Sequence, residues 1–195
     1  MMYGADEDPL CYPGTHVLRN RAGIKDAQEL EQFEMAMFLI RAEEVWPEGD
    51  MDYAHYKAIH RHFFQDVYEW AGEPRRIRIG KGGNWFCYPE HIDREMAGIF
   101  AQLSAENRLI GLPAPAFAAR AAHYLGDINA VHPFREGNGR TQLAFLTLRA
   151  TRAGFACDEE CLDRDRVMNA MIHSFHGNEG PLAALIAQMI GCDQK

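Results

Sequence analysis

The segment from His132 to Arg140 gathers most of the side chains in this sequence that could do chemistry. It reads His-Pro-Phe-Arg-Glu-Gly-Asn-Gly-Arg and holds a base, a carboxylate, two glycines, an amide and an arginine within nine residues. Glycines let a backbone approach a ligand closely and expose its N–H groups. A helix that starts close to Asn138 would add unpaired N–H donors and a partial positive charge, which together favour an anion. The segment therefore predicts a phosphate-binding loop at a helix N-terminus.

Three charged or titratable side chains of this loop have specific chemical uses. Arg140 would lie in the first turn of the helix, where its charge opposes the helix dipole and a bound phosphate would relieve the conflict. Glu136 could hold Mg²⁺, a cation that prefers carboxylate and phosphate oxygens. His132 could act as a general base, because histidine has the side chain whose unperturbed pKa lies nearest neutrality.

The same residues also have structural interpretations. Asn138-Gly139 alone is a common turn signal, and an isolated histidine beside a proline is more often structural. A metal pair of His132 and Glu136 is another alternative, although no HExxH pattern accompanies it. The chain also has no GxxxxGK[ST] P-loop, so the common phosphate cradle is absent. The complete set within one loop favours the functional interpretation.

Helical periodicity dominates the elements that must position this loop, and it predicts a single all-α domain over residues 1–195. After an N-terminal arm over residues 1–22, Asp26 is the N-cap of a helix. The core stripe of that helix is Leu30, Phe33, Met37 and Ile40. Gly72 and Pro74 end the next helix, whose stripe is Tyr56, Ile59, Phe63, Val67 and Trp70. Later helices are expected from Pro89, over 116–131, from the loop to about 153, and over 163–175 and 181–190.

Residues 75–88 differ in kind from these helical stretches. Their alternating pattern, the glycine-rich turn Gly80–Asn84 and the strand-prone run that follows predict one inserted β-hairpin. The loop and the start of the helix after it, residues 132–143, form the predicted active-site segment.

Composition limits the class of protein. With 47% hydrophobic and 25% charged residues, the chain has the composition of an ordinary soluble globular protein. A net charge of −8 argues against a direct nucleic-acid binder, because phosphate neutralisation needs an excess of Lys and Arg. An odd count of five cysteines fits reduced thiols. Neither a signal segment nor a membrane span is expected, and the cytoplasm is the default location.

The loop resembles the signature of the Fic family, HxFx(D/E)GNGRxxR, at every defined position except the last. The resemblance extends to Tyr12-Pro13-Gly14, to Arg19–Ile24 and to Asp66–Gly72, and it covers nearly the whole chain. It implies a Fic-type helical domain with a hairpin called the flap. The implied activity is transfer of AMP from ATP to a hydroxyl side chain (Tyr, Thr or Ser) of a target protein.

The family resemblance also implies a role for each residue of the loop. His132 would deprotonate the target hydroxyl, and Glu136 would hold Mg²⁺ across the α- and β-phosphates of ATP. Asn138 and the amides of Gly137 and Gly139 would grip phosphate oxygens, and Arg140 would pair with the β-phosphate. Phe134 would be a buried anchor that fixes the loop.

The flap would align the target segment by backbone pairing. The flap residues implied in this docking are Ile77, Ile79, Lys81, Trp85 and Phe86.

One position departs from the family pattern. The last signature arginine would fall at position 143, where this sequence has Leu143. In the family that arginine helps to set the γ-phosphate of ATP, so we expect weaker or less productive ATP placement here. Losing one charge-assisted contact costs roughly 1.5–3 kcal/mol. Lys81 on the flap is a hypothetical replacement for the missing charge.

The resemblance further implies a toxin restrained by a separate partner. No Ser or Thr of this chain is followed four residues later by Glu, so the inhibitory pattern [ST]xxxE[GN] is absent. The implied partners are a small antitoxin that carries an inhibitory helix, and a target such as DNA gyrase or topoisomerase IV. Two alternatives stay open: a catalytically weakened Fic-fold module that binds nucleotide or a partner, and a Fic enzyme that uses another donor.

Overall fold

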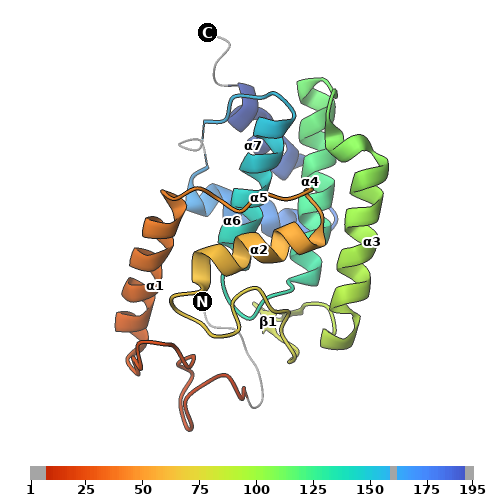
Figure 1. The fold of residues 1–195 in the computed structure, drawn as a ribbon. Coiled ribbons are helices and arrows are strands. Elements are labelled where there is room, and N and C mark those ends of the chain that lie inside the picture. The colour runs from red at the N-terminus through yellow and green to blue at the C-terminus, as the bar shows by residue number, and fades with distance from the viewer. Residues whose placement is uncertain (1–7, 159–161, 192–195) are drawn as a thin grey trace. The chain divides into compact units, whose positions relative to one another are not determined.

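A computed structural model describes residues 8–158 and 162–191 of the chain (Figure 1). The described elements are mainly helical, with one short hairpin, as predicted. Their order is α1 (Ala27–Ala42), α2 (Tyr53–Phe64), β1 (Gly80–Lys81), β2 (Asn84–Trp85), η1 (Pro89–His91), α3 (Ile92–Ala105), η2 (Asn107–Leu109), α4 (Ala114–Val131), α5 (Asn138–Arg152), α6 (Arg164–Phe175) and α7 (Gly180–Gly191). None of the helices in this part of the chain has the length and apolar character needed to span a bilayer.

Backbone contacts divide the chain into two compact units. The first comprises residues 1–92 and 133–141, and the second comprises residues 93–132 and 142–195. The predicted loop therefore lies mostly in the first unit, while His132 and Leu143 belong to the second. Each unit is described by itself below.

In the first unit, α1 packs against α2. Asp26 caps α1 as predicted, because its carboxylate accepts a hydrogen bond from the Glu29 N–H at 2.9 Å. The predicted core stripe of α1 is wrong at one end: Leu30 is buried, whereas Ile40 is 54% exposed. Glu34 is buried instead, and two polar partners described below make the burial of its charge tolerable.

Helix α2 is shorter than its apolar stripe predicts. It ends at Phe64, and the chain continues through turns in which the Val67 and Tyr68 N–H groups both donate to the Phe64 carbonyl. Val67 is still buried, so the periodic apolar pattern correctly marked the core although it extended past the helix. The hairpin is confirmed, but its regular pairing is limited to Gly80 with Trp85 and Lys81 with Asn84.

The described part of the N-terminal arm begins at Asp8. An antiparallel bridge joins Cys11 to Leu18. Asp8 pairs with Arg135 of the loop at 2.6 Å, and both side chains are almost fully buried. The arm is therefore attached to the loop through a buried ion pair.

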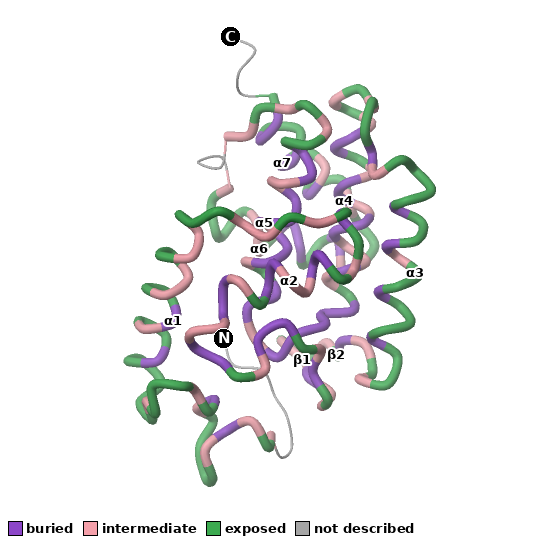
Figure 2. The backbone as a smooth tube through the Cα atoms, viewed as in Figure 1, coloured by how far each residue is buried: buried purple, intermediate pink, exposed green. Residues whose placement is uncertain are grey.

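In the second unit, α4 packs against α6 and α7. Within α3, the apolar side chains of Met96, Phe100 and Leu103 are buried. The tube in Figure 2 shows the buried stretches of α4 and α7, and the buried residues there include Phe117, Ile128, Leu185 and Ile186.

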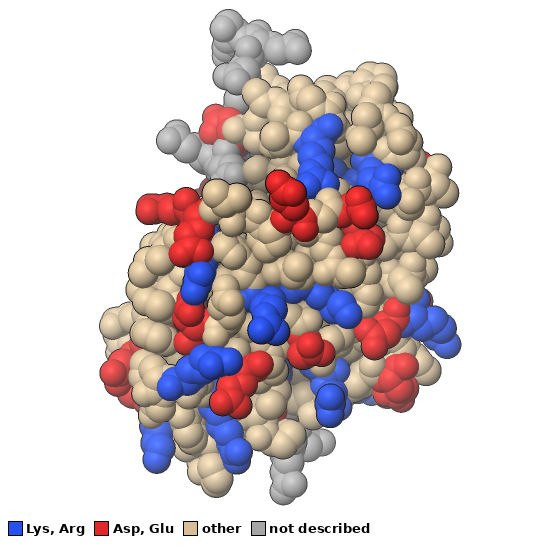
Figure 3. Space-filling model, in the orientation of Figure 1, with Lys and Arg blue, Asp and Glu red and all other residues tan. Residues whose placement is uncertain are grey.

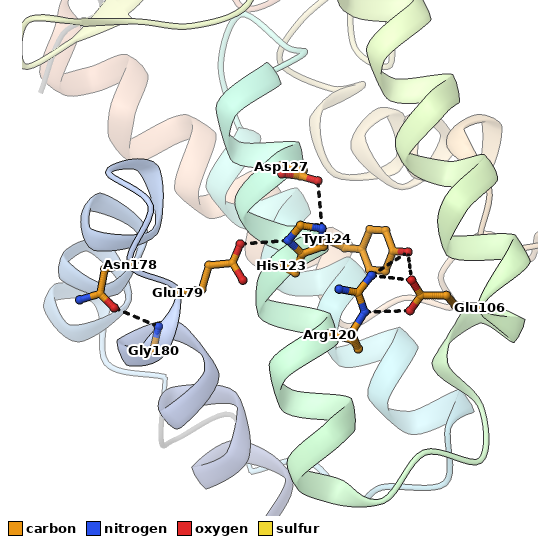
Figure 4. Close-up of polar contacts among 8 residues, drawn as sticks. All are labelled: Glu106, Arg120, His123, Tyr124, Asp127, Asn178, Glu179 and Gly180. Carbon is orange, nitrogen blue, oxygen red and sulfur yellow. Dashed lines mark hydrogen bonds and ion pairs between the residues drawn. The ribbon is translucent and has the colours of Figure 1, made fainter.

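Two polar networks connect α4 to the elements beside it (Figure 4). His123 lies between Glu179, 3.0 Å from Nδ1, and Asp127, 3.6 Å from Nε2. Arg120 and Tyr124 both donate to Glu106, which precedes η2. These contacts fasten α4 to the start of α7 and to the end of α3.

The cysteines that the structure describes are free thiols. Among the described residues, Cys11, Cys87 and Cys157 are not in disulfides, whereas Cys161 and Cys192 lie outside the described residues.

On the face drawn in Figure 3, Lys and Arg side chains are interspersed with Asp and Glu side chains. The expectation that the chain does not bind nucleic acid directly stays a prediction.

Candidate active site

The loop after α4 is closed on itself by Asn138. The Asn138 side chain accepts a hydrogen bond from the Phe134 N–H at 2.9 Å and donates one to the Phe134 carbonyl at 2.8 Å. Only 1% of Asn138 is exposed. Both polar atoms of the amide thus make a hydrogen bond within the loop, and a contact of this side chain with phosphate stays a prediction.

Phe134 anchors the loop, as predicted. Its side chain is fully buried, and its ring stacks against His60 and Tyr56 of α2, with centroids 3.7 and 5.6 Å away. Gly137 has φ +79, and a Cβ atom there would lie 2.4 Å from the ring of Phe64. The loop conformation therefore requires glycine at position 137.

The side chain of His60 makes a hydrogen bond to the loop backbone. The Gly72 N–H donates to its Nδ1 at 2.8 Å, so Nε2 carries the proton and donates to the Glu136 carbonyl at 3.0 Å. Burial lowers the pKa of His60 to about 3, with the cation of Arg140 adding to the effect. A neutral His60 ring is therefore part of the structure that supports the loop.

The loop leads into α5, which begins at Asn138 as predicted. The first N–H groups of an α-helix have no partner within the helix and attract anions. The Gly137 N–H is already used, because it donates to the Glu136 carboxylate at 2.9 Å. The backbone N–H groups of Asn138 and Gly139 lie at the start of the helix.

Glu136 and Arg140 are neighbours on this first turn. Glu136 Oε1 lies 3.9 Å from Arg140 Nη2. Burial and the nearby carboxylate of Glu34 raise the pKa of Glu136, and Arg140 partly offsets this. The carboxylate of Glu136 is a ligand that suits a divalent cation, and the guanidinium of Arg140 is a partner that suits the phosphate oxygens bound to such a cation.

His132, in the second unit, caps α4 in a left-handed conformation with φ 52. Its backbone N–H donates to the Ile128 carbonyl at 2.9 Å, and its Nδ1 lies 3.3 Å from the Asn129 carbonyl. Because a carbonyl can only accept, this contact favours the proton on Nδ1 and leaves the lone pair on Nε2. Leu143 is half-buried in α5.

The flap is tied to the loop by Arg75, a residue that the sequence pattern did not single out. The Arg75 N–H donates to the Pro133 carbonyl at 2.8 Å. Its guanidinium donates to the Ile77 carbonyl at 2.6 Å and to the Cys87 carbonyl at 2.7 Å, one on each side of the hairpin. One buried arginine thus fixes both ends of the flap.

The side chains of the flap divide into two groups. Ile79 and Phe86 are buried, so they anchor the hairpin and do not offer their side chains for docking. Ile77 and Lys81 are half-buried, and Trp85 is 53% exposed. The guanidinium of Arg78 lies 4.9 Å from the Trp85 ring and 3.9 Å from the Tyr88 ring.

A comparison with protein families identifies the chain. A model of the Fic/DOC family matches residues 50–149. The chain belongs to the Fic/DOC family. This Fic domain is 60% identical to the "probable protein adenylyltransferase y4lH" of Sinorhizobium fredii over 96% of the chain and 98% of that protein.

Two other relatives extend the comparison. The chain is 41% identical to the "protein adenylyltransferase VbhT" of Bartonella schoenbuchensis over 94% of its own length and 39% of that protein. The BepC protein of Bartonella tribocorum, solved with bound AMPPNP, is 27% identical with a TM-score of 0.84 over 92% of this chain and 95% of that chain.

Proposed function

We propose that this Fic domain is a protein adenylyltransferase, which transfers AMP from ATP to a hydroxyl side chain of a target protein. The main observation behind this proposal is the loop before α5, in which Glu136 Oε1 lies 3.9 Å from Arg140 Nη2. Relatives named as protein adenylyltransferases and a related structure with bound AMPPNP support the same activity.

The nucleotide end of the site rests on residues of the first unit. Arg140 and the opening N–H groups of α5 would receive phosphate oxygens. Glu136 would hold Mg²⁺, which when bound offsets the charge of the phosphates. Because burial raises the pKa of the Glu136 carboxyl, a bound cation would also favour its ionised form.

His132 is assigned the role of base. Its Nε2 takes the proton of the target hydroxyl, whose oxygen forms a bond to the α-phosphorus of ATP. The bond from that phosphorus to the oxygen bridging to the β-phosphate breaks, and pyrophosphate leaves. The contact of Nδ1 with the Asn129 carbonyl keeps Nε2 in the form that accepts a proton.

The flap supplies the target-binding element of this proposal. Arg75 fixes its two ends, which would leave its backbone and Trp85 to contact an extended target segment. Target specificity beyond a hydroxyl side chain would come from such contacts.

The biological setting is also part of the proposal. We infer a toxin that acts in the cytoplasm on DNA gyrase or topoisomerase IV and is restrained by a small antitoxin. Resemblance to Fic toxins supports this setting, as does the absence of [ST]xxxE[GN] from the sequence.

The experiment is incubation of the purified protein with Mg²⁺, ATP labelled at the α-phosphate and a bacterial lysate. Label on a protein band that disappears with His132→Ala and in the presence of EDTA supports AMP transfer. Leu143 favours a second candidate, a weakened nucleotide-binding module. Binding of ATP without labelling of any protein would support that candidate and overturn transfer.

A further inference from the structure

Arg140 is held by a carboxylate from an element far away in the sequence. Its Nη2 donates to Oε1 of Glu34, which lies in α1. Only 10% of the Glu34 side chain is exposed, compared with 22% of the Arg140 side chain. The pair is therefore mostly buried, with the arginine as the more accessible member.

The second oxygen of Glu34 is also occupied. The hydroxyl of Tyr68 donates to Oε2 of Glu34. Burial, with Glu34 adding to the effect, keeps the pKa of Tyr68 above its usual value, so the hydroxyl stays protonated and remains a donor. Both carboxylate oxygens are thus fixed by buried or half-buried partners.

Two aromatic rings lie close to the guanidinium of Arg140. Its central carbon lies 4.7 Å from the ring of Phe64 and 5.4 Å from the ring of Phe38. The ion pairs of Arg140 that lie within the described residues are made through Nη2. The N–H groups of Nη1, which these ion pairs do not use, thus remain to donate to a phosphate oxygen.

We propose that Glu34 is a positioning residue that, supported by Tyr68, orients Arg140 toward the phosphates of the bound nucleotide. This inference rests on the proposed function, since it concerns the same phosphate-binding arginine. A free arginine side chain loses much conformational freedom on binding. Glu34 imposes that loss during folding, so the nucleotide meets a side chain that is already ordered.

The test compares Glu34→Gln with Glu31→Gln. Glu31 is an exposed residue on the same helix, so its substitution makes the same change in charge without touching Arg140. Calorimetry would measure binding of ADP with Mg²⁺ and, separately, of adenosine. We expect Glu34→Gln to weaken ADP binding about tenfold and to leave adenosine binding unchanged. Glu31→Gln should change neither.

Two further measurements separate positioning from a general loss of structure. In an Arg140→Ala background, Glu34→Gln should have no additional effect on ADP binding, because the group that it orients is gone. Tyr68→Phe, which keeps the ring and removes only the hydroxyl, should weaken ADP binding in the same direction by a smaller factor. Equal losses for ADP and adenosine would overturn the proposal.

The nitrogen-15 relaxation of the Arg140 Nε–Hε group, measured without nucleotide, provides an independent readout. Its order parameter should fall in Glu34→Gln and stay unchanged in Glu31→Gln. An unchanged order parameter, or tighter ADP binding by Glu34→Gln, would overturn the positioning role. Failure of the wild-type chain to bind ADP would instead sink the proposed function, while the relaxation measurement would still decide what Glu34 does.

Discussion

The imidazole of His60 lies nearly flat against the ring of Phe134, with centroids 3.7 Å apart and planes inclined by 22°. The same imidazole accepts from the Gly72 N–H and donates to the Glu136 carbonyl. Protonation would replace the acceptor at Nδ1 with a donor that faces another donor. The loop is therefore built on a histidine that must stay neutral.

The first prediction concerns acid stability. Because the pKa of His60 falls from 6.5 to about 3 on folding, its contribution to stability is present above pH 6.5 and is lost as the pH falls toward 3. Between pH 7.5 and 5 this amounts to about 2 kcal/mol. Urea unfolding at both pH values should show that loss in the wild type, with His60→Gln lacking it. The matched control is His16→Gln, at an exposed histidine of the arm, which should retain the full loss.

The second prediction concerns the two glycines of the loop. Gly137→Ala should destabilise the protein by about 3 kcal/mol or more, because it combines a positive φ with an overlap against the Phe64 ring. Gly139→Ala places its Cβ in open space on a helix and should be neutral or slightly stabilising. Denaturant unfolding of both variants measures the difference, and equal stabilities would contradict the loop geometry.

The third prediction separates the flap from the nucleotide site. Arg75→Lys removes the planar fork that bridges the Ile77 and Cys87 carbonyls, so we expect a looser flap. The KM for the target protein should rise about tenfold, while ADP binding should change little. Steady-state transfer assays and calorimetry check the two parts. Arg76→Lys, at the exposed neighbouring arginine, is the control and should leave both unchanged.

The fourth prediction concerns the position at which the sequence departs from the family signature. Leu143→Arg should raise AMP transfer by about 10- to 100-fold, because it restores a charge-assisted contact for ATP. Leu143 is half-buried in α5, and a long arginine side chain can extend from such a position toward solvent. Lys81→Ala tests the hypothetical replacement and should lower transfer in the wild type only. Equal transfer by wild type and Leu143→Arg would show that this position is not limiting.

The fifth prediction concerns the metal. Glu136→Gln keeps the shape of the side chain and its acceptor for the Gly137 N–H but removes the charge. ADP binding should then lose most of its dependence on Mg²⁺, which titrations with and without EDTA would measure. If ADP binding by the variant depended on Mg²⁺ as strongly as in the wild type, the cation would be held by residues other than Glu136.

Local patterns predicted much of this architecture. The Asp26 cap, the start of α5 at Asn138 and the buried Phe134 all follow from residues within a few positions of one another, where capping and periodicity operate. The same periodic reasoning carried α2 too far, because Val67 is buried without being helical. A buried apolar residue reports the core, and the backbone hydrogen bonds decide where the helix ends.

The supports of the loop were not predictable from such patterns. Glu34 meets Arg140 across more than one hundred residues of sequence, and His60 meets Glu136 across 76. No regular sequence spacing predicts either pair, because the two contacts form only once the first unit is folded. A charged residue within an apolar helix stripe was the available signal for Glu34, and an arginine directly after the Gly-x-Pro turn sequence at residues 72–74 was the signal for Arg75.

Helix α1, which carries Glu34, also limits how far the chain can be truncated before Arg140 loses its partners. The family model begins at residue 50, after α1 has ended at Ala42. A truncated chain with those boundaries would keep every residue of the signature, yet its arginine would have lost both Glu34 and the ring of Phe38. The segment by which the family is recognised is therefore shorter than the segment needed to order the phosphate-binding arginine.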